Sequence, residues 1–152
     1  MNIKAMLGVA AFAASTVFAT GAMAQVKPDI LVKQRQSAMV LQGKYFGPLA
    51  GMASGKVPYN AAVAARNAGY LDALSKMAWD GFDASTSGEK TRALPEVYSD
   101  AAKFKETADR FQAEAGKLLA AAKDGNEANV KAAIGDVGKT CGSCHDNFRQ
   151  KQ

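Results

Sequence analysis

Cysteine and histidine are scarce in this sequence: its 152 residues include two cysteines and one histidine. A structural zinc site normally takes four Cys or His ligands, so a zinc site here would need a carboxylate or a second subunit. Acid–base catalysis beside a bound metal usually needs a further imidazole, and the chain has none to spare. We therefore expect a protein without enzymatic activity, in which any metal site depends on these three residues.

Three further patterns are missing. No segment alternates apolar and polar residues as a half-buried strand does, so sheet-based folds are excluded. No dense basic block accompanies the formal net charge of +5, so we expect no nucleic-acid partner. Beyond the first 24 residues, no apolar run approaches the roughly 20 residues of a membrane-spanning helix. We expect no membrane association of that part of the chain.

The first 24 residues have the pattern of a secretory signal peptide. Lys4 precedes an apolar run over residues 5–18, and Ala22-Met23-Ala24 is a small-residue cleavage site. Cleavage would leave residues 25–152 as one domain with a net charge of +4, because Lys4 is the only charged residue removed. The sequence therefore predicts an exported, periplasmic protein.

The most informative motif is Cys141-Gly142-Ser143-Cys144-His145, close to the C-terminus. Cys-x-x-Cys-His is the attachment signature of a c-type haem. On a helix, Cys141, Cys144 and His145 occupy positions i, i+3 and i+4 and therefore share one side. Two thiols can then add across two vinyl groups of the porphyrin while the imidazole binds the iron. The motif predicts one covalently attached haem c.

Two other interpretations of the cysteine pair are weaker. A thioredoxin-like redox pair opens a helix that follows a strand, and no strand pattern precedes Cys141. A disulfide between Cys141 and Cys144 suits an exported protein, but it leaves the adjacent His145 unexplained.

The first half of the mature chain has the apolar spacing of two helices. The first begins at Pro28 and runs to about Met52, with a bend or weak second half expected because two glycines and a proline lie between residues 43 and 48. Asn60 is the expected N-cap of the second helix, which we extend to about Trp79.

A connection and two more helices follow. Residues 81–99 contain Gly, Ser, Thr and Pro without periodicity and are expected to form a long connection. Ser99 or Asp100 can cap the third helix, and Gly125 suits the break before the fourth, which runs from about residue 127 to 149. The two helices carry apolar stripes with a seven-residue pattern at Phe104, Ala108, Phe111, Ala115, Leu118 and Ala122, and at Val130, Ile134, Val137, Cys141, Cys144 and Phe148.

Together these patterns predict an all-α fold, an antiparallel four-helix bundle with a covalently bound haem. The two cysteines continue an apolar stripe, so the haem is expected inside the bundle where the helices meet. The alanines at the helix contacts are small, so the haem is expected to fill space that side chains leave empty. We therefore expect the haem-free chain to be poorly folded.

Several segments besides the haem motif carry a family pattern. They are Lys27-Pro28-Asp29, residues 32–38, Gly55-Lys56-Val57-Pro58-Tyr59, residues 95–102 and residues 135–140. With these segments the whole mature chain resembles the class II cytochromes c, and specifically the cytochrome c′ family. Gly142 departs from the lysine that is frequent there, but it faces away from the bond-forming side.

The resemblance implies roles for single residues. His145 would be the proximal iron ligand, Arg35 and Gln36 would lie by the haem propionates, and Arg149 would lie on the proximal side near the histidine. Judged from the residues alone, Arg35 is better read as a solvated helix charge, and Arg149 as a cation that suits a helix C-terminus.

Met39 matches the family position over the open side of the iron and leaves two outcomes. If its sulfur binds, the iron is six-coordinate and low-spin, and Met39/His145 ligation makes the protein a plain electron carrier. If Met39 only packs there, the iron stays five-coordinate behind an apolar lid. We favour packing, because the surrounding sequence resembles the five-coordinate members more closely.

The resemblance thus implies electron transfer with an unidentified periplasmic redox partner and a five-coordinate, high-spin haem that binds NO and CO. A gas-sequestering protein without a redox partner is an alternative from another functional class. The family also implies a homodimer that forms through the first two helices. Phe46, Trp79 and Phe82 are either haem-pocket or core aromatics, and the sequence does not separate the two roles.

Overall fold

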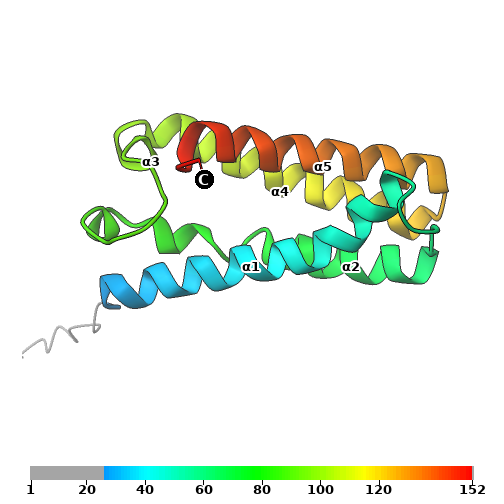
Figure 1. Cartoon of the computed structure of the whole chain (residues 1–152), viewed down its shortest axis with the longest axis horizontal. Helices are drawn as coiled ribbons and strands as arrows, with labels where there is room; N and C mark the ends of the chain where they lie inside the picture. Colours follow the sequence, from blue (N-terminus) through cyan, green and yellow to red (C-terminus); the bar gives the residue numbers. More distant parts are fainter. Residues whose placement is uncertain (1–25, 152) are drawn as a thin grey trace, which may run out of the picture.

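Four long helices dominate the computed structural model, which describes residues 26–151 (Figure 1). They are α1 (Pro28–Ala53), α2 (Ala61–Leu74), α4 (Ala101–Asp124) and α5 (Glu127–Phe148). Helix α1 packs against α2 and α5, and α4 packs against the same two helices, which closes a ring of four neighbours. This arrangement confirms the predicted helical bundle. The predicted signal segment, residues 1–24, lies outside the described residues.

Side chains and glycine conformation define the helix ends as the sequence predicts. Asn60 caps α2 by accepting a hydrogen bond from the backbone of Val63 at 2.9 Å. Asp100 caps α4, and Asn126 caps α5. Gly125, with φ of 82°, adopts the left-handed conformation that ends α4 and allows the sharp reversal into α5.

Helix α2 ends at Leu74, five residues before the predicted end at Trp79. The Ser75 hydroxyl donates to the carbonyl oxygen of Asp72 at 2.7 Å, and from Lys76 onward the backbone bonds shift to partners three residues back. A serine that competes for helix carbonyls in this way favours the end of a helix. The expected extension to Trp79 was therefore wrong.

Helix α1 continues through the glycines and Pro48 as far as Ala53. Its last turns rise toward α5 in Figure 1, which agrees with the expected change of direction near Pro48. A proline inside a helix removes one backbone bond, so the turns around it depend on packing against neighbouring helices.

The predicted stripe of α4 is buried at all six positions, and on α5 Val130, Ile134 and Val137 are buried as well. Phe111, Leu118 and Ala122 of α4 and these three residues of α5 form one core cluster with the C-terminal part of α1 and with α2. A second, smaller cluster forms around Val97, Phe104 and Phe148 at the other end of the bundle. Trp79 packs against both clusters and therefore spans the region between them.

The connection contains short helical turns that the sequence pattern did not predict: η1 (Trp79–Phe82), η2 (Ala84–Thr86) and α3 (Glu96–Ser99). Its later part pairs with the C-terminal tail. The backbone N–H of Leu94 donates to the carbonyl oxygen of Phe148 at 3.0 Å, and the backbone N–H of Gln150 donates to the carbonyl oxygen of Arg92 at 2.9 Å. These bonds hold the connection against the end of α5. Within residues 26–151, no helix is long and apolar enough to cross a membrane.

Candidate functional site

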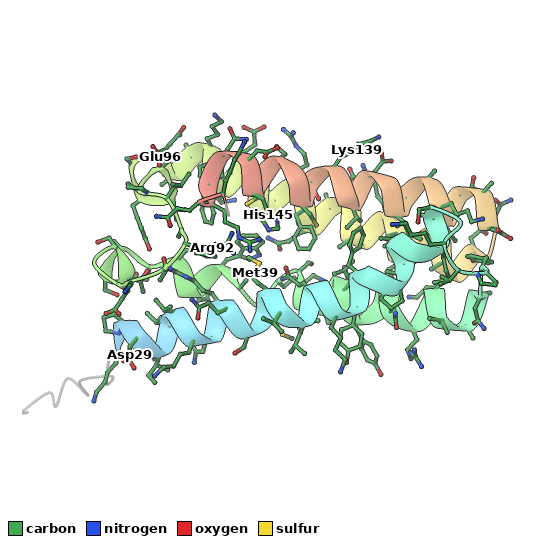
Figure 2. The ribbon with its side chains drawn as sticks, viewed as in Figure 1. Asp29, Met39, Arg92, Glu96, Lys139 and His145 are labelled. Atoms are coloured by element: carbon green, nitrogen blue, oxygen red, sulfur yellow. The ribbon has the colours of Figure 1, made fainter. Side chains whose placement is uncertain are left out.

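A cavity of about 620 Å³ lies between the two core clusters. Helices α1, α4 and α5 and the connection all contribute to its walls. The seven site residues predicted from the sequence all line it, namely Arg35, Gln36, Met39, Cys141, Cys144, His145 and Arg149. Figure 2 shows Met39 on α1 and His145 on α5 on opposite sides of the space between these helices. The volume falls in the range of small-molecule and cofactor sites.

The haem motif lies near the C-terminal end of α5, in unbroken helix. Helical spacing places Cys141, Cys144 and His145 on the wall of one cavity, as the sequence predicts. Both cysteines are half-buried and carry free thiols. The arrangement therefore presents two sulfurs and one imidazole to the same space.

Burial sets the protonation of the two thiols. It raises the pKa of Cys141, and it raises the pKa of Cys144 to about 11, with a smaller contribution from the neighbouring Cys141. At neutral pH both groups are therefore protonated thiols. A protonated thiol is a poor nucleophile toward oxidants and alkylating agents.

The pKa of His145 is shifted in the opposite direction. Burial is the largest cause and lowers this pKa, and the positive charges of Arg149 and Arg92 lower it further. The negative charge of Asp146 raises it by a smaller amount. The Arg149 Nη1 atom lies 3.5 Å from Nε2 of the ring. The imidazole is therefore neutral at physiological pH, and the neutral ring is the form that binds metal ions.

Arg35 is buried, with 3 % of its surface exposed, and is not the solvated charge that its residue type alone suggests. Its Nη1 atom donates to the carbonyl oxygen of Gly81 at 2.6 Å and to the Thr86 hydroxyl at 2.9 Å. The same atom lies 3.3 Å from the Tyr98 hydroxyl, and Nη2 donates to Thr91 at 3.2 Å. Four groups of the connection thus orient this guanidinium.

No carboxylate pairs with Arg35 among the described residues. The ion pairs found in that part of the chain are all local pairs on helix surfaces, three or four residues apart. A buried cation without an anion is costly unless a bound group supplies the charge. Because Arg35 also lines the cavity, its charge suits the carboxylate of a haem.

The remaining walls of the cavity are mainly apolar. Six aromatic side chains from four parts of the chain line it: Phe46, Trp79, Phe82, Phe104, Phe111 and Phe148. Phe46, Trp79 and Phe82 therefore belong to the cavity, and the last two also pack in the small cluster. The Phe82 ring lies 4.4 Å from the Arg35 guanidinium carbon, a cation–π contact. A flat, largely apolar group with carboxylates at one edge fits these walls.

Sequence reasoning missed the residues of the connection that shape this site. Thr86, Thr91 and Tyr98 hold Arg35, and Arg92 lines the cavity. A connection without periodicity does not indicate which of its side chains point inward. The available signal in the sequence was the number of Ser, Thr and Tyr residues between residues 85 and 99. Their hydroxyl groups can accept hydrogen bonds from a buried cation only if the loop that carries them is ordered.

Comparison with known proteins is consistent with this geometry. The sequence model described as cytochrome c′ matches residues 30–149. Cytochrome c′ of Rubrivivax gelatinosus is 46% identical over 126 residues, which are 82% of this chain and 98% of that protein. Cytochrome c′ of Alcaligenes xylosoxydans is 42% identical over 126 residues, 83% of this chain and 98% of its own.

Solved structures resemble this chain to the same degree. The crystal structure of the Rubrivivax gelatinosus protein has a TM-score of 0.78 and covers 82% of this chain and 98% of its own. A nitric oxide complex of a mutant of cytochrome c prime from Alcaligenes xylosoxidans is 41% identical, with a TM-score of 0.78, and covers 84% and 99%. A carbon monoxide-bound variant from the same organism is 42% identical, with a TM-score of 0.76, and covers 83% and 98%.

Proposed function

Since this chain belongs to the cytochrome c′ family of haem proteins, we propose that it holds one haem c through Cys141 and Cys144, with His145 on the iron. The observation that carries this proposal is the shared cavity. Two thiols, a neutral imidazole and a buried, unpaired guanidinium all face one mainly apolar space. When bound, a haem supplies a one-electron iron couple and a coordination position for a small gas.

The two free thiols of Cys141 and Cys144 suit attachment as thioethers, because both line the cavity. Each S–H would add across one vinyl group, so that the sulfur would bond to one carbon and the hydrogen would go to the other. The addition needs no oxidant or reductant. The protonated thiols of Cys141 and Cys144 supply both the sulfur and the hydrogen.

In this proposal Arg35 and Gln36 bind propionate groups, and Arg149 acts beside His145. Four acceptors of the connection contact the Arg35 guanidinium, which has five N–H donors, so donor capacity is left for a carboxylate. Gln36 follows Arg35 on α1 and lines the same cavity with an exposed amide. Arg149 lies next to the imidazole, and its charge adds to the effect of burial, which lowers the pKa of His145.

We propose further that Met39 packs over the iron without binding it, which leaves the iron five-coordinate and high-spin. Met39 is half-buried on the α1 wall of the cavity, and Phe46, two helical turns further along α1, continues this apolar surface. An apolar wall admits small uncharged diatomic molecules such as NO and CO and disfavours anions. The gas complexes of the Alcaligenes xylosoxidans relatives support this assignment.

The cellular role is part of the same proposal. Residues 1–24 direct export and are removed, and residues 25–152 act in the periplasm as an electron-transfer and gas-binding protein with an unidentified redox partner. No catalysed reaction is assigned, because the single histidine is used as an iron ligand.

A homodimer completes the proposal. Large apolar side chains are exposed on the first two helices, with Val40 71% exposed and Leu41 and Tyr70 also accessible. Tyr45 and Tyr70 lie against each other, with ring centroids 4.7 Å apart, and join the surfaces of α1 and α2. A second copy would cover this apolar surface.

Two measurements on the purified protein test the haem assignment. Expression in a host that attaches c-type haem should give a coloured product whose mass exceeds that of residues 25–152 by one haem. Reduction should give a single broad visible band, as expected for a five-coordinate haem, and CO or NO should change it. A colourless product of bare polypeptide mass contradicts the proposal. Two sharp bands would support the low-spin Met39/His145 carrier instead.

A further inference from the structure

Arg92 is a second cation on the cavity wall, and the backbone around it is fixed. Its carbonyl oxygen accepts from the N–H of Gln150, and two residues later Leu94 donates to Phe148. These bonds clamp the residue to the end of α5, close after the haem motif. The side chain is half-buried and lines the cavity, and Figure 2 shows it in the space between α1 and α5.

The guanidinium of Arg92 has free hydrogen-bonding capacity. Its Nη2 atom donates to the carbonyl oxygen of Gln150 at 3.0 Å. As with Arg35, no carboxylate pairs with it anywhere in residues 26–151. A guanidinium has five N–H donors, so most of them remain for another partner.

Thr91 joins Arg92 to the buried Arg35. The Thr91 hydroxyl accepts from Nη2 of Arg35 at 3.2 Å and from the backbone N–H of Ala93 at 3.1 Å. One short segment thus positions two guanidinium groups on the same cavity. Three arginines line the cavity without a protein anion among the residues that the structure describes, and one of them, Arg149, lies against the ring of His145. Arg35 and Arg92 are left for the two carboxylates that a haem carries.

We infer that Arg92 binds the second carboxylate of the haem and raises the reduction potential of the iron. This inference rests on the proposed function and extends it to a residue of the connection. The physical reason is electrostatic: reduction removes one positive charge from the haem, so a nearby fixed cation favours the reduced state. Pairing with the carboxylate also cancels a negative charge that would favour the oxidised state.

The test compares the reduction potentials of three variants of the haem-loaded protein. Arg92→Gln removes the charge at the cavity. Arg110→Gln removes the same charge from the surface of α4, where Arg110 pairs with Glu106 at 2.7 Å and does not line the cavity. Arg92→Lys keeps the charge but loses the planar fork that binds a carboxylate with two bonds.

We expect Arg92→Gln to lower the equilibrium constant for one-electron reduction about tenfold, which corresponds to about 59 mV. Arg110→Gln should leave it within twofold of the parent protein, and Arg92→Lys should lie between the parent and Arg92→Gln. A crystal structure of the haem-loaded parent should place a guanidinium nitrogen of Arg92 about 2.7–2.9 Å from a haem carboxylate oxygen.

The outcomes separate this inference from the proposed function. If Arg92→Gln takes up haem but its potential shifts no more than that of Arg110→Gln, Arg92 has no such role while the haem assignment stands. A haem-loaded crystal structure with both carboxylates away from Arg92 overturns the inference in the same way. If the parent protein takes up no haem, the proposed function itself fails.

Discussion

Arg35 on α1 makes a tight contact with Gly81 of the connection. The guanidinium donates to the Gly81 carbonyl oxygen at 2.6 Å, and the two backbones approach so closely that a Cβ atom on Gly81 would lie 2.6 Å from the Cβ atom of Arg35. It would also lie 2.7 Å from the carbonyl oxygen of Leu31. Only glycine fits at this position, and the fit holds the connection over the cavity.

Replacement of Gly81 by alanine should therefore destabilise the protein. Because the clash involves backbone and a side-chain atom close to it, α1 and η1 must move apart, at a cost of about 1–3 kcal/mol. Urea denaturation of the haem-loaded protein measures this cost. Gly88→Ala is the matched control, since a Cβ atom there has open space in the same connection. Equal stability of the two variants would show that the approach of α1 to η1 is not tight.

Arg35→Lys should destabilise the haem-loaded protein by about 1–3 kcal/mol, although the charge is retained. An ammonium group cannot reach the carbonyl of Gly81 and the hydroxyls of Thr86, Thr91 and Tyr98 at once, so buried acceptors lose their donor. The free energy of unfolding in urea reports the loss. The exposed Arg66→Lys serves as control and should change stability by less than about 0.5 kcal/mol. A stability change at Arg35 as small as that control would argue against the hydrogen-bonded cluster.

Met39→Leu should leave the visible spectra of the oxidised and reduced protein unchanged. Leucine has a similar volume and no sulfur, so it fills the same apolar wall without a ligand atom. Absorption spectroscopy before and after reduction is the measurement. A change from two sharp bands to one broad band on this substitution would establish Met39 as a ligand and contradict the five-coordinate assignment.

The haem-free protein should not melt as a cooperative, highly helical fold. The site is lined mainly by apolar side chains, and without haem these surfaces stay in contact with water, so the bundle loses part of the apolar burial on which its marginal stability depends. Circular dichroism of the double variant Cys141→Ser, Cys144→Ser, purified without haem, tests this. The haem-loaded parent is the reference, and a sharp transition of equal helicity in the variant would disprove the expectation.

The sequence predicted the helical elements best where apolar spacing repeats over several turns. All six stripe positions of α4 are buried, and Asn60 and Gly125 act as the expected helix boundaries. Periodicity failed at the end of α2, where Ala78 is buried but lies outside the helix. A short apolar segment has the same spacing whether it continues a helix or folds into tighter turns, because burial depends on the neighbouring elements.

The haem motif and its helical spacing were local properties of the sequence, because three residues within two helical turns face one side whatever surrounds them. The burial of Arg35 and the position of Arg92 depend on groups between 46 and 63 residues away along the chain. No local pattern encodes such contacts. Only the packing of the connection across α1 and the end of α5 decides that these cations face the cavity instead of water.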